Sequence, residues 1–464
     1  MVFRRVSQKN TNRVLLTGYW LLVTLLLLGC GERVLPTATP EPTAAPTNTP
    51  APTPTVIPMG LYVDTTDALG PISPLVYGTN YGPWLVVTVD VQDEFEVSGL
   101  TYLRFPGGRF GDTRNVQSFD IDRLIDLAAT IDAEVTISVR LLGGTPERAA
   151  ELVEYTNIEK GYGVKYWSIG NEPSLYIDLQ KEAEWDTEFY NEQWRLYAEA
   201  MLAVDPTIEL LGPNIHQISA DYAARPKDPS GRDWLEEFLV ANGDMVDVVT
   251  VHRYPFPISR TQPVPTLDQL RNNPQEWDSI IPALRKTVRD LTGEDKPIGI
   301  MEINSNYLDV SSLDTSPDSF YNAIWWGDVL GRLIRQEVEQ VTHFALQNNR
   351  SGWGMLGRTE PRPTYYTYQL YQRFGQDLLF SESDDSHVSV LAAQRDDGAT
   401  TVMLINMLDE AATKPLKIVG LDTNEASEVW RLEDGIMAEN MGPMTVGDTI
   451  ELPGWSMTLL VFDQ

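Results

Sequence analysis

Two glutamates occupy positions where apolar, β-rich segments meet polar residues, and both have the side chain needed for acid, base or nucleophile chemistry. Glu172 follows the apolar run 166–170 in the order Gly-Asn-Glu-Pro, and Glu302 interrupts the apolar run 297–303. Proline ends a strand, and an unpaired buried carboxylate is costly, so each glutamate needs a partner or a role. The structural alternatives are a helix N-terminal carboxylate for Glu172 and an ion pair with a barrel arginine for Glu302.

The elements that must position these glutamates form a regular pattern between about residues 71 and 380. Eight short apolar runs alternate with amphipathic segments, at 75–80, 101–105, 134–140, 166–170, 209–213, 246–252, 297–303 and 341–346. This pattern predicts an α/β fold, a (β/α)8 TIM barrel. A doubly wound open sheet is the alternative, but no glycine-rich phosphate turn follows the first run, which disfavours it.

In such a barrel Glu172 ends the fourth strand and Glu302 lies near the end of the seventh. Side chains at the carboxyl ends of barrel strands face one cavity, which is where barrel enzymes place their chemistry. Two carboxyl groups that face each other are the minimal equipment for hydrolysing a glycosidic bond. A separation of about 5–5.5 Å would indicate retention of the anomeric configuration, and more than about 6.5 Å would indicate inversion.

Four sequence segments resemble the large clan of TIM-barrel retaining glycoside hydrolases. Residues 167–173 (Trp-Ser-Ile-Gly-Asn-Glu-Pro) resemble the clan's acid/base segment, and 103–108 (Leu-Arg-Phe-Pro-Gly-Gly) resembles the α-L-arabinofuranosidase branch. Residues 170–176 are similar to β-glucuronidase and heparanase-like members, and 76–80 to endoglucanase, xylosidase and arabinofuranosidase members. The resemblance covers residues 60–464, and its segments point to different branches.

The resemblance implies a role for several further residues. Glu172 would be the acid/base and Glu302 the nucleophile. Arg104 would hold Glu302 ionised, Asn171 would bind the sugar 2-hydroxyl, and His252 or Tyr254 would hydrogen-bond Glu302. Other candidates for the sugar subsites end strands or lie in the loops that follow them: Asn80, Asn214, His216, Trp84, Tyr307 and Trp353. A single histidine is more often a structural residue, and some of the aromatic side chains must belong to the core.

Other classes of site find little support in the sequence. The four histidines show no His-x-x-x-His spacing, and no Gly-x-Ser-x-Gly segment is present. We therefore expect no metal and no cofactor. The formal net charge of −31 makes nucleic acid an unfavourable partner, and it also disfavours a polyanionic substrate unless a local basic cleft overrides it.

The N-terminus has the features of an export signal. Basic residues precede the apolar stretch 14–28, and Cys30, the single cysteine of the chain, follows Leu-Leu-Gly. This pattern resembles a bacterial lipobox, with a signal peptide over 1–29 and a lipid attached to Cys30. An ordinary signal followed by an incidental cysteine is the alternative. A linker rich in Pro and Thr then extends to residue 58, so we expect an exported lipoprotein tethered to a membrane, without a disulfide.

After about residue 380, short β-rich runs separated by Asp-Gly turns replace the alternating pattern. They predict a C-terminal antiparallel β-sandwich formed by 59–70 and 381–464, which leaves 71–380 as the catalytic barrel. The complete reading is an exported O-glycosyl hydrolase that cleaves a poly- or oligosaccharide by double displacement. A non-catalytic carbohydrate-binding surface lipoprotein and a transglycosylase remain alternatives, and the sequence does not identify the sugar.

Overall fold

The computed structural model describes residues 59–464, except 178–183, 257–260, 262–263, 351 and 464. The expected signal peptide, Cys30 and the Pro/Thr-rich linker lie outside the described residues. Within the described part of the chain, no helix has both the length and the apolar character needed to cross a membrane.

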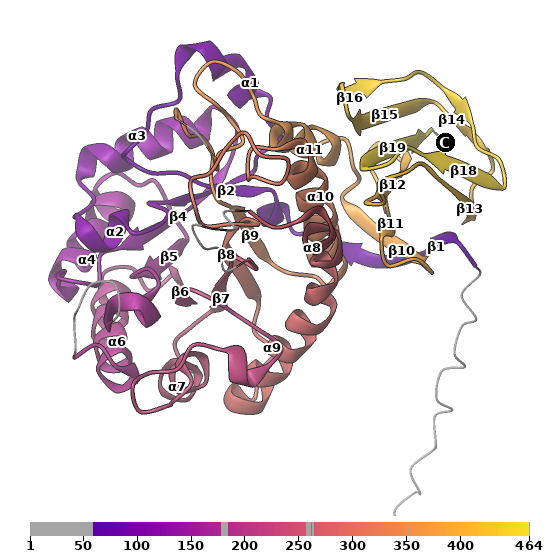
Figure 1. Cartoon of the computed structure of the whole chain (residues 1–464). Coiled ribbons are helices and arrows are strands. Elements are labelled where there is room, and N and C mark those ends of the chain that lie inside the picture. Colours follow the sequence, from indigo (N-terminus) through magenta and orange to yellow (C-terminus); the bar gives the residue numbers. More distant parts are fainter. Residues whose placement is uncertain (1–58, 178–183, 257–260, 262–263, 351, 464) are drawn as a thin grey trace, which may run out of the picture. The chain divides into compact units, whose positions relative to one another are not determined.

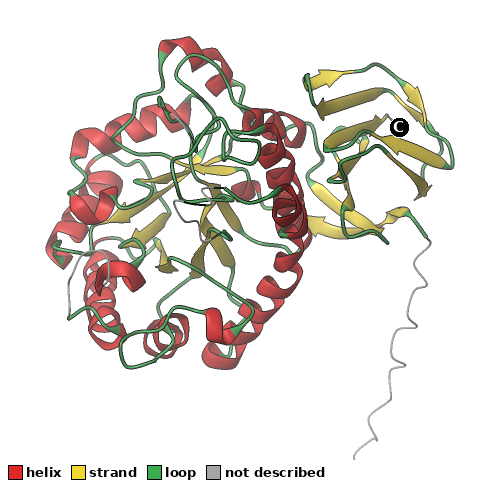
Figure 2. Ribbon diagram, viewed as in Figure 1, coloured by secondary structure: helices red, strands yellow, loops and turns green. Residues whose placement is uncertain are grey.

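Eight parallel strands close into a barrel in chain order, which confirms the predicted fold class. Figure 2 shows the strands inside and the helices around them. The strands are β2 (Gly78–Asn80), β3 (Tyr102–Phe105), β4 (Glu134–Val139), β5 (Tyr166–Ile169), β6 (Glu209–Ile215), β7 (Val248–Arg253), β8 (Ile298–Ile303) and β9 (Gln340–His343).

The helices of the described chain follow the amphipathic segments of the sequence, and side-chain caps fix where several of them begin. The Asp186 carboxylate accepts the Phe189 N–H at the start of α6, and the Ser319 hydroxyl accepts the Asn322 N–H at the start of α10. The helices are α1 (Gln92–Glu96), α2 (Phe110–Thr113), α3 (Ser118–Ala129), α4 (Pro146–Val153), α6 (Thr187–Val204), α7 (Trp234–Asn242), α8 (Leu267–Asn272), α9 (Trp277–Thr292), α10 (Phe320–Arg335) and α11 (Pro363–Tyr371) (Figure 1).

The two ends of the barrel differ in chemistry. Tyr102, Tyr166 and Val248 are the first residues of β3, β5 and β7, and they pack with Leu211 and Met301 into a small buried cluster. The polar side chains Arg104 and Glu302 come later in their strands, followed by Glu172 after the end of β5. Apolar packing therefore fills one end of the barrel and leaves the carboxyl ends of the strands for the polar residues.

Helix α10 is buried on nearly all sides. Besides its packing on the barrel, it contacts β11, β12 and β19 of the C-terminal sheet. The neighbouring residues Trp325 and Trp326 point in different directions from the helix, yet both are fully buried. Contacts with two layers explain why nearly all of this helix is buried, including Asp328 and Arg332, which form an ion pair with each other.

The C-terminal region is a mostly antiparallel sheet of nine strands, in the order β16-β15-β19-β12-β11-β10-β1-β13-β18, with a separate pair β14-β17. Its N-terminal member β1 (Leu61–Pro71) pairs antiparallel with β10 and parallel with β13. The other strands are β10 (Asp377–Ser383), β11 (Val388–Gln394), β12 (Thr400–Asn406), β13 (Ala412–Val419), β14 (Glu425–Ala426), β15 (Glu428–Glu433), β16 (Ile436–Asn440), β17 (Met444–Thr445), β18 (Thr449–Leu452) and β19 (Ser456–Phe462). Their buried apolar side chains form a core of their own, separate from that of the barrel.

Candidate active site

Glu302 lies on β8 within a dense set of hydrogen-bond donors and is only 3% exposed. Its Oε1 accepts hydrogen bonds from Arg104 at 2.6 Å and from the Gly108 N–H at 2.7 Å, and its Oε2 accepts one from the Tyr254 hydroxyl at 2.9 Å. Burial raises the pKa of this carboxyl, but the charges of His252 and Arg104 and these hydrogen bonds outweigh burial and hold the pKa below its usual range. Glu302 is therefore ionised at neutral pH.

Tyr254 is the donor that completes this set, one residue after β7. Burial, together with the charges of Glu302 and Glu172, raises the pKa of its hydroxyl well above the usual value. The hydroxyl therefore keeps its proton and acts only as a donor toward Glu302. The expected hydrogen bond between Tyr254 and Glu302 is present.

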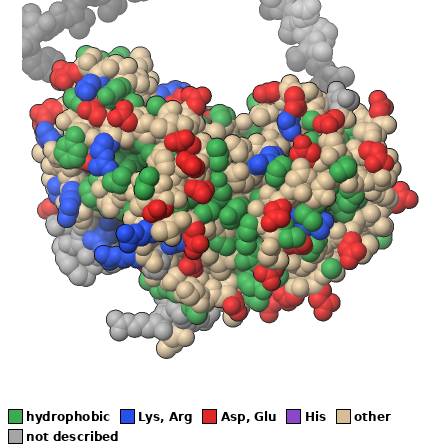
Figure 3. All heavy atoms as spheres, turned by 90° about the horizontal axis from the view of Figure 1, so that it is seen from above, with side chains coloured by type: hydrophobic (Ala, Val, Ile, Leu, Met, Phe, Trp, Pro, Cys, Tyr) green, Lys and Arg blue, Asp and Glu red, His purple; other side chains and the backbone are tan. Residues whose placement is uncertain are grey.

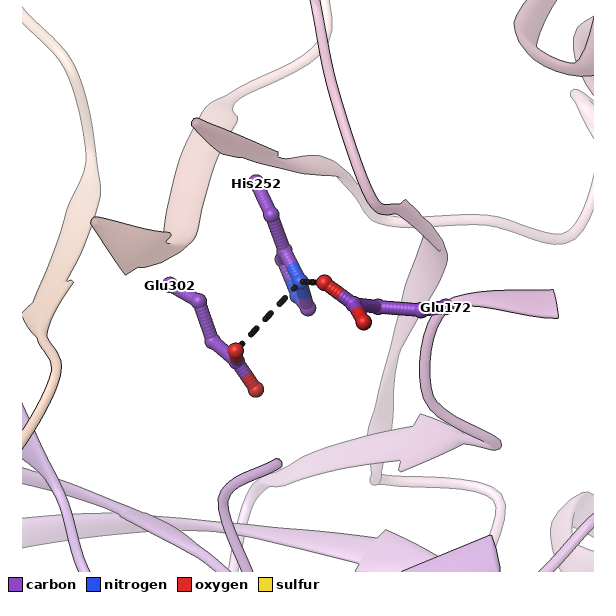
Figure 4. A group of neighbouring side chains, drawn as sticks. All are labelled: Glu172, His252 and Glu302. Atoms are coloured by element: carbon purple, nitrogen blue, oxygen red, sulfur yellow. Dashed lines mark hydrogen bonds and ion pairs between the residues drawn. The ribbon is translucent and has the colours of Figure 1, made fainter. Parts of the chain in front are cut away.

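Glu172 lies close to Glu302 but has a different environment. Its Oε1 lies 3.0 Å from His252 Nδ1, and 15% of its side chain is exposed. The same His252 nitrogen is 3.8 Å from Glu302 Oε2, beyond a hydrogen bond, so His252 bonds to Glu172 and not to Glu302. One carboxylate oxygen of each glutamate and a nitrogen of His252 all lie within 4.8 Å of one another. Figure 4 shows the three side chains pointing toward one another; Glu172 follows the end of β5, His252 lies on β7 and Glu302 on β8.

The backbone that carries Glu172 is unusual. Glu172 has φ 47° and ψ 53°, a left-handed conformation that is uncommon for a residue other than glycine. Its N–H donates to the Asn214 carbonyl at 3.1 Å, and Asn214 also has a positive φ, 53°. The Asn214 side chain is fully buried and donates to Ser168 on β5 at 2.5 Å. Asn214 therefore supports the Glu172 backbone from β6, and contact of its side chain with a sugar stays a prediction.

Arg104 connects the two sides of the site. Its guanidinium donates to Asn80 Oδ1 at 2.9 Å and to Asn171 Oδ1 at 2.8 Å, in addition to Glu302. Asn80 is fully buried, and its amide donates to three main-chain carbonyls, among them that of Met301. We therefore assign Asn80 to holding Arg104 rather than to contact with a sugar. The Asn171 amide nitrogen has no partner in the described chain, which leaves it available for the expected sugar hydroxyl.

Asp112 is a member of the site that the sequence did not indicate. It lies on the short helix α2 and is 2% exposed, and its Oδ1 accepts hydrogen bonds from the Tyr176 hydroxyl at 2.5 Å and from the Asn171 N–H at 3.3 Å. Burial raises the pKa of this carboxyl to about 8, more than the two hydrogen bonds lower it. Asp112 is thus largely protonated at neutral pH, directly behind the Asn171–Glu172 segment. Its only sequence signal was an acidic residue soon after a Pro-Gly-Gly turn.

The remaining candidates lie farther out. His216 is half-buried, and its Nδ1 lies 2.8 Å from the Ser174 hydroxyl, close to the Glu172 turn. Tyr307 is 51% exposed and packs edge-on against Tyr254 at 6.3 Å between ring centroids. Trp353 packs against Phe344 at 5.1 Å. Its contact with Tyr254 places Tyr307 beside the Glu302 environment. Trp353 contacts Phe344 instead and lies farther from Glu302.

The spacing of Glu172, His252 and Glu302 is also compatible with a metal ion, because their ligand atoms lie within 4.8 Å of one another. A divalent cation there would approach the Arg104 guanidinium, which is 2.6 Å from Glu302, and like charges repel. Both oxygens of Glu302 already accept hydrogen bonds. The donor set therefore fits a hydrogen-bonded carboxylate pair better than a set of metal ligands.

Comparisons with known proteins bear on the fold of the chain. No protein-family model matches the chain. Over 161 residues the chain is 30% identical to the intracellular exo-α-(1→5)-L-arabinofuranosidase of Halalkalibacterium halodurans, a stretch that covers 31% of this chain and 29% of that protein. The chain therefore matches less than a third of the length of this curated relative.

Solved structures match over most of the chain. A xyloglucanase of glycoside hydrolase family 44 from Paenibacillus polymyxa has a TM-score of 0.68 at 15% identity, over 87% of this chain and 99% of that chain. The α-L-arabinofuranosidase of Thermotoga maritima has a TM-score of 0.64 at 20% identity, over 87% and 100%. A family 51 arabinofuranosidase from Xanthomonas axonopodis pv. citri has a TM-score of 0.68 at 14% identity, over 88% and 100%. In fold, the chain thus resembles the TIM-barrel glycoside hydrolases of families 44 and 51.

Proposed function

We propose that this protein hydrolyses a glycosidic bond with retention of the anomeric configuration. The carboxylate of Glu302 attacks the anomeric carbon while Glu172 gives its proton to the leaving oxygen, so that a covalent glycosyl–enzyme forms and the aglycone departs. Glu172 then takes a proton from water, and that water displaces Glu302 from the anomeric carbon. Each step conserves charge between the two carboxyl groups and needs no further reactant besides water.

The observation that carries this proposal is the pair of carboxylates with unequal environments. An oxygen of each lies within 4.8 Å of the other, which is closer than the roughly 6.5–9.5 Å that an inverting pair needs for an intervening water. Glu302 is held ionised by Arg104, Gly108 and Tyr254, as suits a nucleophile. Glu172 has only His252 as a side-chain partner in the described chain and is more open to solvent, as suits a group that exchanges protons.

The substrate class can be narrowed by the activities that the similar proteins are named for. These include arabinofuranosidase, xyloglucanase and a bifunctional glucanase-xylanase. We propose a poly- or oligosaccharide of the arabinan, xylan, β-glucan or xyloglucan type. Incubation with each polymer, followed by separation of the products, would identify the sugar and distinguish removal of terminal units from internal cleavage.

The roles of the two glutamates can be separated with aryl glycosides of the sugar that the wild-type protein cleaves. Glu302→Ala should lose about 100-fold or more of kcat with every leaving group, because no covalent intermediate can form. Glu172→Ala should lose a similar factor with poor leaving groups but much less with a dinitrophenyl leaving group, which departs without a proton. Glu192→Ala, an exposed position on α6, serves as the control.

Two results would contradict the proposal. One is near-normal turnover by both alanine variants whose thermal unfolding matches that of the wild type. The other is binding of polysaccharide without cleavage of any bond, which would identify a carbohydrate-binding protein instead. A product that carries a sugar acceptor in place of water would indicate transglycosylation by the same two residues.

We also propose that the protein is exported and anchored to membrane lipid through Cys30. The support is in the sequence: basic residues, the apolar stretch 14–28, and the single cysteine directly after it. Labelled palmitate supplied to bacteria that express the protein should be incorporated into the wild type and not into Cys30→Ser. Equal labelling of both, or no labelling of either, would contradict the anchor.

A further inference from the structure

A stacking surface with two cationic side chains lies beside the proposed active site, and none of the roles above uses it. It is formed by Trp84 in the loop after β2 and by Arg109, Phe110 and Arg114 in and around α2, after β3. We call these four residues the rim platform. The rings of Trp84 and Phe110 have centroids 5.7 Å apart, and the Arg114 guanidinium lies 5.8 Å from the Phe110 centroid.

The rim platform connects directly to the Glu302 environment through the backbone. The N–H of Gly108 donates to Glu302 Oε1 at 2.7 Å, and Arg109 is the next residue in the chain. Phe110 and Arg114 then begin and follow α2, the helix that also carries Asp112. The platform therefore continues directly from the segment whose backbone hydrogen-bonds the nucleophile.

The aromatic part of the platform has a defined position although it is accessible. Trp84 is 41% exposed, yet its ring lies so close to Gly82 that a Cβ there would be 1.8 Å from the indole. Any other residue at position 82 would displace the ring. An exposed indole held against a glycine presents a flat face, the kind of surface on which sugar CH groups stack.

The two arginines are exposed, and neither forms an ion pair with any Asp or Glu in the described part of the chain. Figure 3 shows Lys and Arg side chains interspersed with Asp and Glu on the face seen from above. The chain as a whole carries a formal charge of −31. At physiological ionic strength, charges beyond about 8 Å are largely screened, so a ligand at the platform experiences these arginines more than the distant carboxylates.

We propose that the rim platform is a sugar subsite that selects a carboxylated sugar residue, a uronic acid, next to the bond that is cleaved. The indole and the Phe110 ring would contact the apolar face of the sugar, while Arg109 and Arg114 would pair with its carboxylate. The natural substrate would then be an acidic polysaccharide, in spite of the acidic surface of the protein. This inference rests on the proposed glycosidase function and names its substrate class.

The test compares each acidic polymer with its own neutral form. Glucuronoxylan and a uronate-bearing pectic arabinan are supplied natively and after chemical reduction of their carboxyl groups, so only the charge differs. The wild type should have a higher kcat/KM on the native form, and this preference should weaken as salt concentration rises. Arg109→Gln/Arg114→Gln should lower the native-to-reduced ratio about tenfold, the effect of two exposed charge pairs.

Arg395→Gln is the control, because it removes one partly exposed arginine, paired with Asp397 in a turn of the C-terminal sheet, and should leave the ratio unchanged. Trp84→Ala should lower kcat/KM on both forms alike, because stacking does not depend on the carboxylate. An unchanged ratio in the double variant, or a wild type that cleaves only polymers without uronic acid, would overturn the inference while the glycosidase function stands. Failure of the wild type to cleave any glycoside would instead reject the proposed function.

Discussion

The two glutamates of the site differ in the number of donors that reach them. Glu302 accepts three hydrogen bonds, one of them from a fully buried arginine, whereas Glu172 has one histidine nitrogen at 3.0 Å. Because donors stabilise the anion, the asymmetry divides the roles between two chemically identical side chains. The sequence indicated both glutamates and the Arg104 contact, since each belongs to a recognisable strand end. It offered His252 or Tyr254 as the partner of Glu302; Tyr254 takes that place and His252 bonds to Glu172, because spacing along one strand does not determine which of two facing carboxylates is nearer.

Asp112 provides a prediction at the scale of a residue. In the folded state its pKa is raised from 3.8 to about 8. At a pH between these two values, the folded state therefore keeps a proton that the unfolded state has released. The free energy of unfolding should therefore fall as pH rises through this window, by up to about 1.4 kcal/mol per pH unit. Asp112→Asn should remove that part of the pH dependence. Urea unfolding of both proteins from about pH 4 to pH 9 measures it.

Asp112 makes no such contribution if the free energies of unfolding of the wild type and of Asp112→Asn change with pH in parallel between the two pKa values. Asp122→Asn is a useful comparison because this carboxylate has the opposite shift: hydrogen bonds from Tyr162 and Tyr155 lower its pKa against the effect of burial. Its stabilising effect is present above the unfolded pKa and is lost as pH falls. Asn at position 122 should therefore change the acid side of the profile only.

At the scale of elements, the strands were predictable and the loops that complete the site were not. All eight expected runs contain most of a barrel strand, because the alternation of apolar strands with amphipathic helices is visible in the sequence. In the first run, 75–80, only the last three residues form the strand β2, and a 3₁₀ turn at Pro74–Val76 precedes them. Proline at the start of that turn fixes φ and removes a donor, which favours the turn over a strand. Asp112, the Gly108 N–H and the platform residues come from loops, whose conformation follows no periodicity.

The loop after β3 gives a prediction at this scale. A Cβ on Gly107 would lie 2.5 Å from Asn80 Oδ1, the atom that accepts a hydrogen bond from Arg104. Gly107→Ala should therefore displace Arg104 from Glu302, and a shift of about 1 Å can cost roughly 100-fold in kcat. Gly111→Ala is the control, since its Cβ would meet Pro106 at an ordinary 3.4 Å. Equal kcat values for both variants would show that the Asn80–Arg104 contact does not position the nucleophile.

The whole molecule consists of a barrel and a sheet, and the strands of the sheet come from segments before and after the barrel in the sequence. Strand β1 precedes the barrel, yet it lies within the C-terminal sheet between β10 and β13. Leu61 and Val63 of β1 are buried in the core of that sheet. The sequence predicted both a separate β-region after about residue 380 and the membership of 59–70 in it, but not the partners β10 and β13, because pairings between residues more than 300 positions apart leave no local signal. The N-terminal targeting features remain a prediction from the sequence.

A truncation tests the place of β1. A chain that begins at residue 59 should retain the stability of the barrel and the sheet, whereas one that begins at residue 72 lacks the strand that joins β13 and β18 to the other six. The shorter chain should expose apolar surface from both neighbouring strands, lower the thermal midpoint by several degrees or more, and aggregate. Identical thermal midpoints for the two chains would mean that β1 adds nothing to the sheet.

The central claim is that Glu302 and Glu172 act by double displacement. The most direct measurement follows the anomeric proton of the first product by NMR during hydrolysis of a glycoside that the protein cleaves. Because the two carboxylate oxygens lie within 4.8 Å of each other, the first product should have the same anomeric configuration as the substrate, before mutarotation converts it. Appearance of the opposite anomer first would show that water attacks directly, and would contradict the assignment of Glu302 as nucleophile.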